Sequence, residues 1–145
     1  MFERLHLTML LALLLLSACG TAQSPTEPMN TLIDRIEPKT AHAPVMVIFG
    51  GNPHRRDEVL RHLATLGDLG AYAALSEEEG YALLEQHKDR VKLVLIGGRY
   101  TAEQRVRIKA WCHERFPSIA FTEPGVDYAY DNELTKAAVK RILGL

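Results

Sequence analysis

The stretch Val45-Met46-Val47-Ile48-Phe49-Gly50-Gly51-Asn52-Pro53-His54-Arg55-Arg56 decides the fold of this chain. Its apolar run is typical of a buried β-strand, and Gly-Gly ends that run. Asn52 then has the side chain of a helix N-cap, and Pro53 occupies the first helical position, which suits proline. The stretch therefore predicts a strand, a tight turn and a helix, which is the opening unit of a parallel α/β sheet.

Beyond this stretch, short apolar runs alternate with amphipathic helical patterns. Further strands are predicted at 71–75, 91–96 and 119–122, and the helices are predicted to begin after caps at Asn52, Ser76, Thr101 and Asp131 or Asn132. This alternation predicts a small doubly wound parallel α/β sheet of four or five strands, in the order 2-1-3-4. Residues 126–130 are either a fifth strand at the edge, giving 2-1-3-4-5, or an ordered loop.

Two residues within the predicted helices carry specific expectations. Gly80 lies inside the second helix, where glycine costs about 1 kcal/mol relative to alanine, so we expect that helix to approach the sheet closely. Cys112 falls on the apolar side of the third helix. We therefore expect its thiol to be buried and inert.

The beginning of the chain has the pattern of an export signal. Residues 7–16 are almost wholly apolar, but a membrane-spanning helix needs roughly 20 such residues, so this segment is predicted to be the core of a signal peptide. Leu16-Ser17-Ala18-Cys19 follows it. One interpretation of this pattern is an ordinary secretory signal with an incidental cysteine.

The motif Leu16-Ser17-Ala18-Cys19 resembles the lipobox of bacterial lipoproteins. That resemblance implies removal of residues 1–18 and lipidation of the Cys19 sulfur, which would hold the protein on a membrane. Gly20 follows the cysteine, where lipoproteins that stay at the inner membrane have aspartate. The resemblance therefore implies an exported protein on the outer membrane, facing the periplasm, if the source is Gram-negative.

Residues 19–43 have the composition of a flexible linker, rich in proline and small polar residues. The predicted organisation is thus a signal peptide, a lipid-anchored linker and an α/β domain at 44–145. Within the linker, Leu32, Ile33 and Ile36 predict one helical turn over 30–37, which packs on the domain or on a partner.

The α/β domain resembles the response-regulator receiver, a flavodoxin-like family, in the stretch Ser76-Glu77-Glu78-Glu79-Gly80-Tyr81-Ala82-Leu83-Leu84 and in Asp127-Tyr128. The resemblance implies a flavodoxin-like fold over residues 44–145. Its chemistry does not carry over. Gly50, Gly51 and Asn52 stand where the family has acidic residues for magnesium, and Gly97 stands where it has the phospho-accepting aspartate. Only Thr122 matches, as the hydroxyl residue after the fourth strand, so phosphotransfer is not expected.

The two Gly-Gly turns form the first candidate site. In the order 2-1-3 they lie side by side at the carboxyl edge of the sheet, where such folds bind ligands. Glycine turns and helix N-termini attract anions, and arginines in a first helical turn oppose the helix dipole unless a negative group is near. Candidate ligand-binding residues are Gly50, Gly51, Asn52, His54, Arg55, Arg56, Gly97, Gly98, Arg99 and Thr122. The alternative is a purely structural turn, with Asp57 and Glu58 balancing the arginines.

Several kinds of site lack a signature in this sequence. Neither Gly-Gly turn has G-x-G-x-x-G or P-loop spacing, so no nucleotide cofactor is predicted. His54 and His113 lack partners at ligand spacing, so no metal is predicted. No catalytic residues are assigned, because no G-x-S-x-G elbow is present. A net charge of −1 gives no general attraction to nucleic acid.

The second candidate site is the acidic and aromatic loop 123–133, with Tyr128 and Tyr130, because tyrosine is enriched at recognition surfaces. Our leading hypothesis is a non-catalytic, lipid-anchored module that binds a protein partner or an envelope component through its carboxyl-edge loops. The alternative is a binder of a small anion or a phosphorylated metabolite, or a degenerate enzyme, that uses the Gly-Gly turns.

Overall fold

The computed structural model describes Gly20 and residues 31–145. The chain divides into two units, residues 1–31 and Leu32–Leu145, and the fold described here is that of the second unit. The predicted signal peptide and the lipobox at Leu16-Ser17-Ala18-Cys19 lie outside the described residues. None of the helices described combines the length and the apolar character that crossing a membrane requires.

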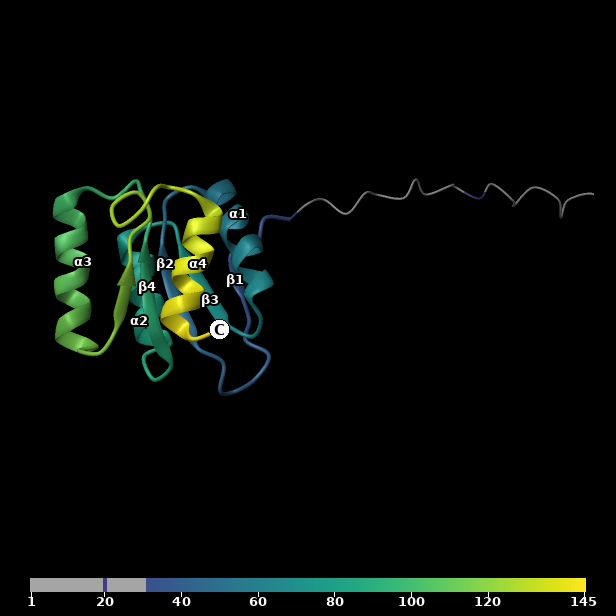
Figure 1. The fold of residues 1–145 in the computed structure, drawn as a ribbon, viewed down its shortest axis with the longest axis horizontal. Coiled ribbons are helices and arrows are strands. Elements are labelled where there is room, and N and C mark those ends of the chain that lie inside the picture. Colours follow the sequence, from purple (N-terminus) through teal and green to yellow (C-terminus); the bar gives the residue numbers. More distant parts are fainter. Residues whose placement is uncertain (1–19, 21–30) are drawn as a thin grey trace, which may run out of the picture. The chain divides into compact units, whose positions relative to one another are not determined.

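The second unit is an α/β domain built on a five-stranded sheet in the order β1-β3-β2-β4-β5 (Figure 1). The strands are β1 (Arg35–Ile36), β2 (Val45–Phe49), β3 (Gly70–Ala74), β4 (Val91–Ile96) and β5 (Ala120–Thr122). β2, β3, β4 and β5 run parallel, and β1 pairs antiparallel with β3. The four parallel strands follow one another across the sheet in the predicted order 2-1-3-4, with β2 and β4 at the centre.

Residues 126–130, predicted as either a fifth strand or an ordered loop, do not form a strand. Residues 126–130 form a loop with a single bridge between Pro124 and Tyr128. The backbone N–H groups of Val126 and Asp127 both donate to the carbonyl of Glu123, at 3.0 and 2.9 Å. This turn prevents the chain from extending beside β5. Of the two predicted alternatives, the ordered loop is therefore the one observed, and the flavodoxin-like order 2-1-3-4-5 is not matched exactly.

The fifth strand is β1, which comes from the segment that the composition assigned to the linker. Here the chain is extended and does not form the predicted helical turn. The N–H of Ile33 donates to the Asp57 carboxylate at 2.8 Å, and Ile33 and Ile36 pack against the core. Pairing with β3 satisfies backbone groups that an isolated helical turn would leave to water. The segment from Leu32 onward therefore belongs to the folded domain.

Four α-helices of the domain cover the two faces of the sheet. They are α1 (Pro53–Leu63), extended by the 3₁₀ turn η1 (Ala64–Leu66), then α2 (Glu77–Gln86), α3 (Ala102–Arg115) and α4 (Asn132–Leu143). Each begins at a cap that the sequence predicted: Asn52, Ser76, Thr101 and Asp131 all accept backbone N–H groups through their side chains. The cap positions are confirmed.

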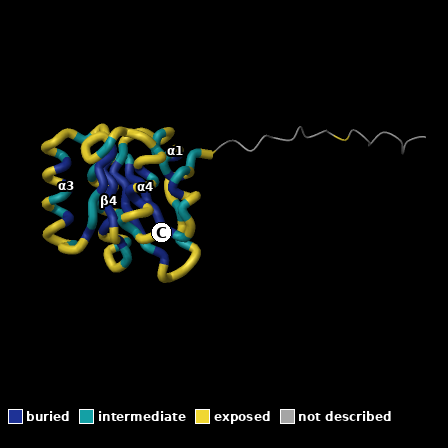
Figure 2. The backbone as a smooth tube through the Cα atoms, in the orientation of Figure 1, coloured by how far each residue is buried: buried dark blue, intermediate teal, exposed yellow. Residues whose placement is uncertain are grey.

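The core has two layers because neighbouring residues of β2 point to opposite faces. Met46 and Ile48 belong to the layer that includes residues of α1 and α4, whereas Val47 and Phe49 belong to the layer that includes residues of α2 and α3. All residues of β2 are buried, and in Figure 2 the central strands are the dark core between partly exposed helices. Cys112 lies in the second layer, fully buried as predicted, and burial raises the pKa of its thiol to about 12.

Gly80 confirms the expectation of a close approach between helix and sheet. A Cβ added to Gly80 would lie 2.2 Å from Cε1 of Phe49, on the neighbouring strand β2. Phe49 is fully buried and cannot move aside without disturbing the layer around it. Glycine at this position of α2 is therefore a packing requirement.

Gly80→Ala should destabilise the domain by about 1–3 kcal/mol, because overpacking a filled core outweighs the gain in helix propensity. Urea denaturation measures the effect as a lower transition midpoint. Glu78→Ala, on an exposed position of the same helix, is the matched control and should leave the midpoint almost unchanged. A Gly80→Ala variant more stable than the wild type would show that helix propensity governs this position.

Candidate functional site

The two Gly-Gly turns meet at the carboxyl edge of the sheet, as the sequence predicted. The N–H of Gly97 donates to the carbonyl of Phe49 at 2.8 Å, and the N–H of Gly50 donates to Ala74 at 3.1 Å. A Cβ on Gly97 would lie 2.9 Å from the Phe49 oxygen. The turns therefore sit side by side only because residue 97 has no side chain.

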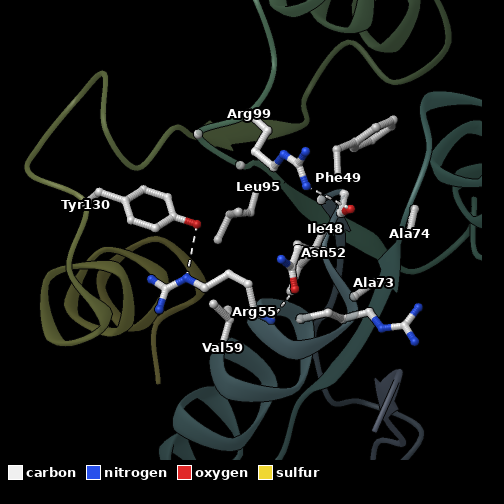
Figure 3. A pocket seen from close by; sticks show the side chains of 15 residues that line it. Ile48, Phe49, Asn52, Arg55, Val59, Ala73, Ala74, Leu95, Arg99 and Tyr130 are labelled. Carbon is white, nitrogen blue, oxygen red and sulfur yellow. Dashed lines mark hydrogen bonds between the residues drawn. The ribbon is translucent and has the colours of Figure 1, made fainter. Parts of the chain in front are cut away.

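A small pocket lies between these turns, with a cavity volume of about 50 Å³. Its apolar lining consists of Ile48, Phe49, Val59, Ala73, Ala74 and Leu95, and its polar lining consists of Asn52, Arg55, Arg56, Arg99, Tyr130 and the four turn glycines. Figure 3 shows Leu95 lying between Arg55 and Arg99, with Val59 on the other side of Arg55. The site thus combines an apolar interior with three arginines.

Arg55 is held in a fixed position by two partners. Its Nε donates to the Tyr130 hydroxyl at 3.1 Å, and its Nη1 lies 2.8 Å from a Glu58 carboxylate oxygen. The guanidinium carbon is also 4.5 Å from the centre of the Tyr130 ring. Burial alone lowers the pKa of Arg55, but the hydrogen bonds to Glu58 and Tyr130 outweigh it and raise the pKa above its ordinary value.

Arg56 and Arg99 have no carboxylate partner among the residues that the structure describes. The Arg56 Nε is buried and makes no hydrogen bond, and an unpaired buried donor is unfavourable by about 1–3 kcal/mol. Arg99 is exposed and donates only to the Gly51 carbonyl, at 3.2 Å. The pocket therefore carries three guanidinium groups, and among the described residues only that of Arg55 forms an ion pair with a carboxylate, that of Glu58.

The N-terminus of α1 contributes less to this site than the sequence suggested. The Asn52 side chain accepts the N–H groups of His54 and Arg55, at 2.9 and 3.1 Å, and the Asn52 carbonyl accepts that of Arg56, at 2.9 Å. These donors are consequently taken by the cap. The His54 side chain is exposed and does not line the pocket.

Thr122 is not brought into the pocket either. It is buried in β5, and its hydroxyl lies 2.7 Å from the hydroxyl of Tyr128. Tyr128 is therefore half-buried on the β5 side, whereas Tyr130 is exposed and lines the pocket. The two tyrosines of this loop thus have different surroundings.

A buried ionic cluster beside the pocket has no counterpart in the sequence-based expectations. Arg105 lies 3.0 Å from one Glu123 oxygen and Lys109 lies 2.6 Å from the other. Arg105 also donates to the Gly97 carbonyl at 2.7 Å, so it fixes the end of β4. Arg105 stands one helical turn before the buried Ile108, a position on the apolar face of α3, and that spacing is the signal that could have revealed it.

Burial by itself raises the pKa of Glu123, but the hydrogen bonds from Lys109 and Arg105 outweigh burial and hold the pKa below its ordinary value. Glu123 therefore remains ionised in the folded domain at neutral pH. Its backbone N–H in turn donates to Asp127 at 2.9 Å. The cluster consequently links α3, the end of β4 and the loop that carries Tyr130.

No group of three His, Cys, Asp or Glu side chains in the described part of the chain could hold a metal ion. Comparisons with protein-family models, with curated proteins and with solved structures find no match for this chain.

Glu123→Gln should lower the free energy of unfolding by up to about 3–5 kcal/mol at neutral pH, because it leaves buried cations without their counter-charge. The bonds from Lys109 and Arg105 that lower the pKa of Glu123 stabilise the folded wild type fully at pH values above 4.5, the ordinary pKa of glutamate. This stabilisation is lost as the pH falls through the lowered pKa of Glu123 in the folded state. Chemical denaturation between pH 7 and pH 3 measures both effects. Glu78→Gln, an exposed control, should keep the wild-type pH dependence; equal pH dependence in Glu123→Gln would contradict this role.

Proposed function

We propose that the domain binds a small anionic ligand in the pocket between the two Gly-Gly turns. The observation that carries this proposal is the excess of arginine: of the guanidinium groups of Arg55, Arg56 and Arg99, only that of Arg55 has a carboxylate partner. An anion would balance the remaining positive charge. It would also give the buried Arg56 Nε the hydrogen-bond partner that it lacks.

The size of the pocket favours a small ligand over a nucleotide. A cavity of about 50 Å³ accommodates a few water molecules or a comparable group, since one water needs about 10–15 Å³. Nucleotide and drug-sized ligands occupy sites of about 300–1,000 Å³. The sequence also lacks a phosphate-binding glycine motif, which likewise disfavours a nucleotide.

We also propose that the domain is tethered to a membrane through a lipidated Cys19. The support is the lipobox-like motif Leu16-Ser17-Ala18-Cys19 behind an apolar segment. Several acyl chains would anchor the protein stably, where a single chain gives only reversible binding. In a Gram-negative cell the domain would then face the periplasm from the outer membrane.

A second candidate function is docking of a protein partner on the loop after β5 and the first turn of α4. Val126, Tyr130 and Leu134 are 60%, 48% and 46% exposed there, and exposed apolar and aromatic side chains are typical of recognition surfaces. Tyr130 belongs both to this surface and to the pocket. A partner and a small ligand would therefore compete for it.

Anion binding should raise the melting temperature of the full chain with the logarithm of ligand concentration above the Kd, because a ligand at 100 times its Kd stabilises by about 2.7 kcal/mol. Thermal shift with phosphate, sulfate and carboxylates at constant ionic strength measures this. Arg56→Met combined with Arg99→Met should abolish the shift. Arg141→Met removes an exposed charge on α4 and should not.

Two results would contradict anion binding: no anion shifts the melting temperature, or Arg141→Met loses the shift as completely as the pocket variant. If no anion binds while a photo-crosslinker at Tyr130 captures a defined protein, the docking function replaces it.

Cys19→Ala should abolish lipidation and release the chain from the membrane fraction, because the acyl chains supply the anchor. Fractionation with metabolic labelling by a tagged fatty acid measures both. Cys112→Ala, which removes the buried thiol, is the matched control and should remain labelled. Membrane retention of the unlabelled Cys19→Ala variant would overturn the proposed anchor.

A further inference from the structure

We infer that the ligand of the pocket is a short apolar carboxylate, that is, a carboxylate group on a hydrocarbon body of a few carbon atoms. This inference rests on the proposed function and specifies its chemical class. It follows from two properties of the site, which are an apolar interior and a cationic border.

The interior of the pocket is apolar on every element that contributes to it. Ile48 comes from β2, Ala73 from β3, Leu95 from β4 and Val59 from α1. Two of the four turn glycines have their N–H groups engaged, since Gly50 donates to Ala74 and Gly97 donates to Phe49. A phosphate or sulfate ion placed among these apolar side chains would lose much of its hydration, which is strongly unfavourable.

The border of the pocket supplies the donors that a carboxylate needs. A guanidinium matches a carboxylate with two parallel N–H donors, and such charge-assisted bonds are stronger than neutral ones. The buried Arg56 Nε is one such donor, and Arg99 has all but one of its donors free of a partner in the described part of the chain. Arg55 holds Tyr130, which also lines the pocket, through the 3.1 Å bond to its hydroxyl.

The shape of the pocket suits a compact hydrocarbon body. The ring of Tyr130 packs over Gly98, where an added Cβ would lie 3.1 Å from Cε2 of the ring, so it closes one side of the recess. A cavity of about 50 Å³ leaves room for a few methylene or methyl groups. Burying each of these should improve the affinity about fourfold.

This chemistry has two possible sources, which are a free short-chain acid and the C-terminal residue of a peptide. Isothermal titration of the full chain separates them with matched probes at one pH and one ionic strength. The probes are acetate, butyrate, isovalerate, its neutral analogue isovaleramide, N-acetyl-leucine and inorganic phosphate. N-acetyl-leucine carries the carboxylate on a peptide unit, so tighter binding than isovalerate identifies a chain terminus, and weaker binding identifies a free acid.

The expected result is a Kd that falls about fourfold per methylene from acetate to butyrate, with no detectable binding of isovaleramide. Arg56→Met should weaken butyrate binding about tenfold to a hundredfold, because a charge-assisted hydrogen bond is lost. Val59→Thr keeps the volume but makes the lining polar, so it should reduce the difference between butyrate and acetate. Val106→Thr, on an exposed position of α3, is its control.

The failures of the two proposals are distinguishable. Phosphate binding more tightly than butyrate, with the same dependence on Arg56 and Arg99, would overturn the apolar carboxylate and leave the anion site standing. Equal affinity for acetate and butyrate would also overturn it. If none of the probes binds the folded protein, the anion site itself fails.

Discussion

The carboxyl end of β2 is the constraint on which the rest of the domain depends. Phe49 is fully buried there, and its ring makes edge contacts with Tyr81 and Tyr100, with ring centres 5.8 and 6.2 Å apart. Gly80 lets α2 approach that ring, and Gly97 lets β4 approach the Phe49 carbonyl. Phe49 thus fixes how closely α2 and the end of β4 approach β2. The pocket exists because the turns that follow these two strands are held this close.

The ionic cluster of Arg105, Glu123 and Lys109 fixes a second part of the pocket, the turn after β4 and the loop of Tyr130. Arg105 bonds to the carbonyls at the end of β4, and Glu123 begins the loop that carries Tyr130. A buried ion pair contributes little net stability compared with an apolar contact of similar volume, but losing one partner is strongly unfavourable. The main effect of this cluster is therefore to fix the positions of the segments that it joins. It links the β4 turn to the loop of Tyr130 without occupying the pocket.

Local patterns in the sequence predicted most of the fold, and non-local contacts account for what they missed. The caps at Asn52, Ser76 and Thr101 and the apolar runs of β2 and β4 depend on neighbouring residues, so they could be read directly. β1 could not, because two residues have no periodicity and their pairing is determined by β3. The loop after β5 was ambiguous because the turn at Glu123 depends on backbone bonds that composition does not reveal. At the site, the sequence predicted that the glycines and arginines come together and that Asn52 caps the helix, but it could not show that the Thr122 hydroxyl bonds to Tyr128.

The charge on the pocket follows from how the acidic residues near α1 are distributed. Asp57 was a candidate to balance the arginines, yet its carboxylate accepts the N–H of Ile33 at 2.8 Å and lies 2.9 Å from Arg61. The Asp57 carboxylate is thus engaged by Ile33, just before β1, and by Arg61. Glu58 balances Arg55 alone. The segment that contains Ile33 and β1 therefore engages, through Asp57, a carboxylate that could otherwise balance the pocket arginines. This segment follows the proposed membrane anchor in the sequence, and it helps to leave the pocket positively charged.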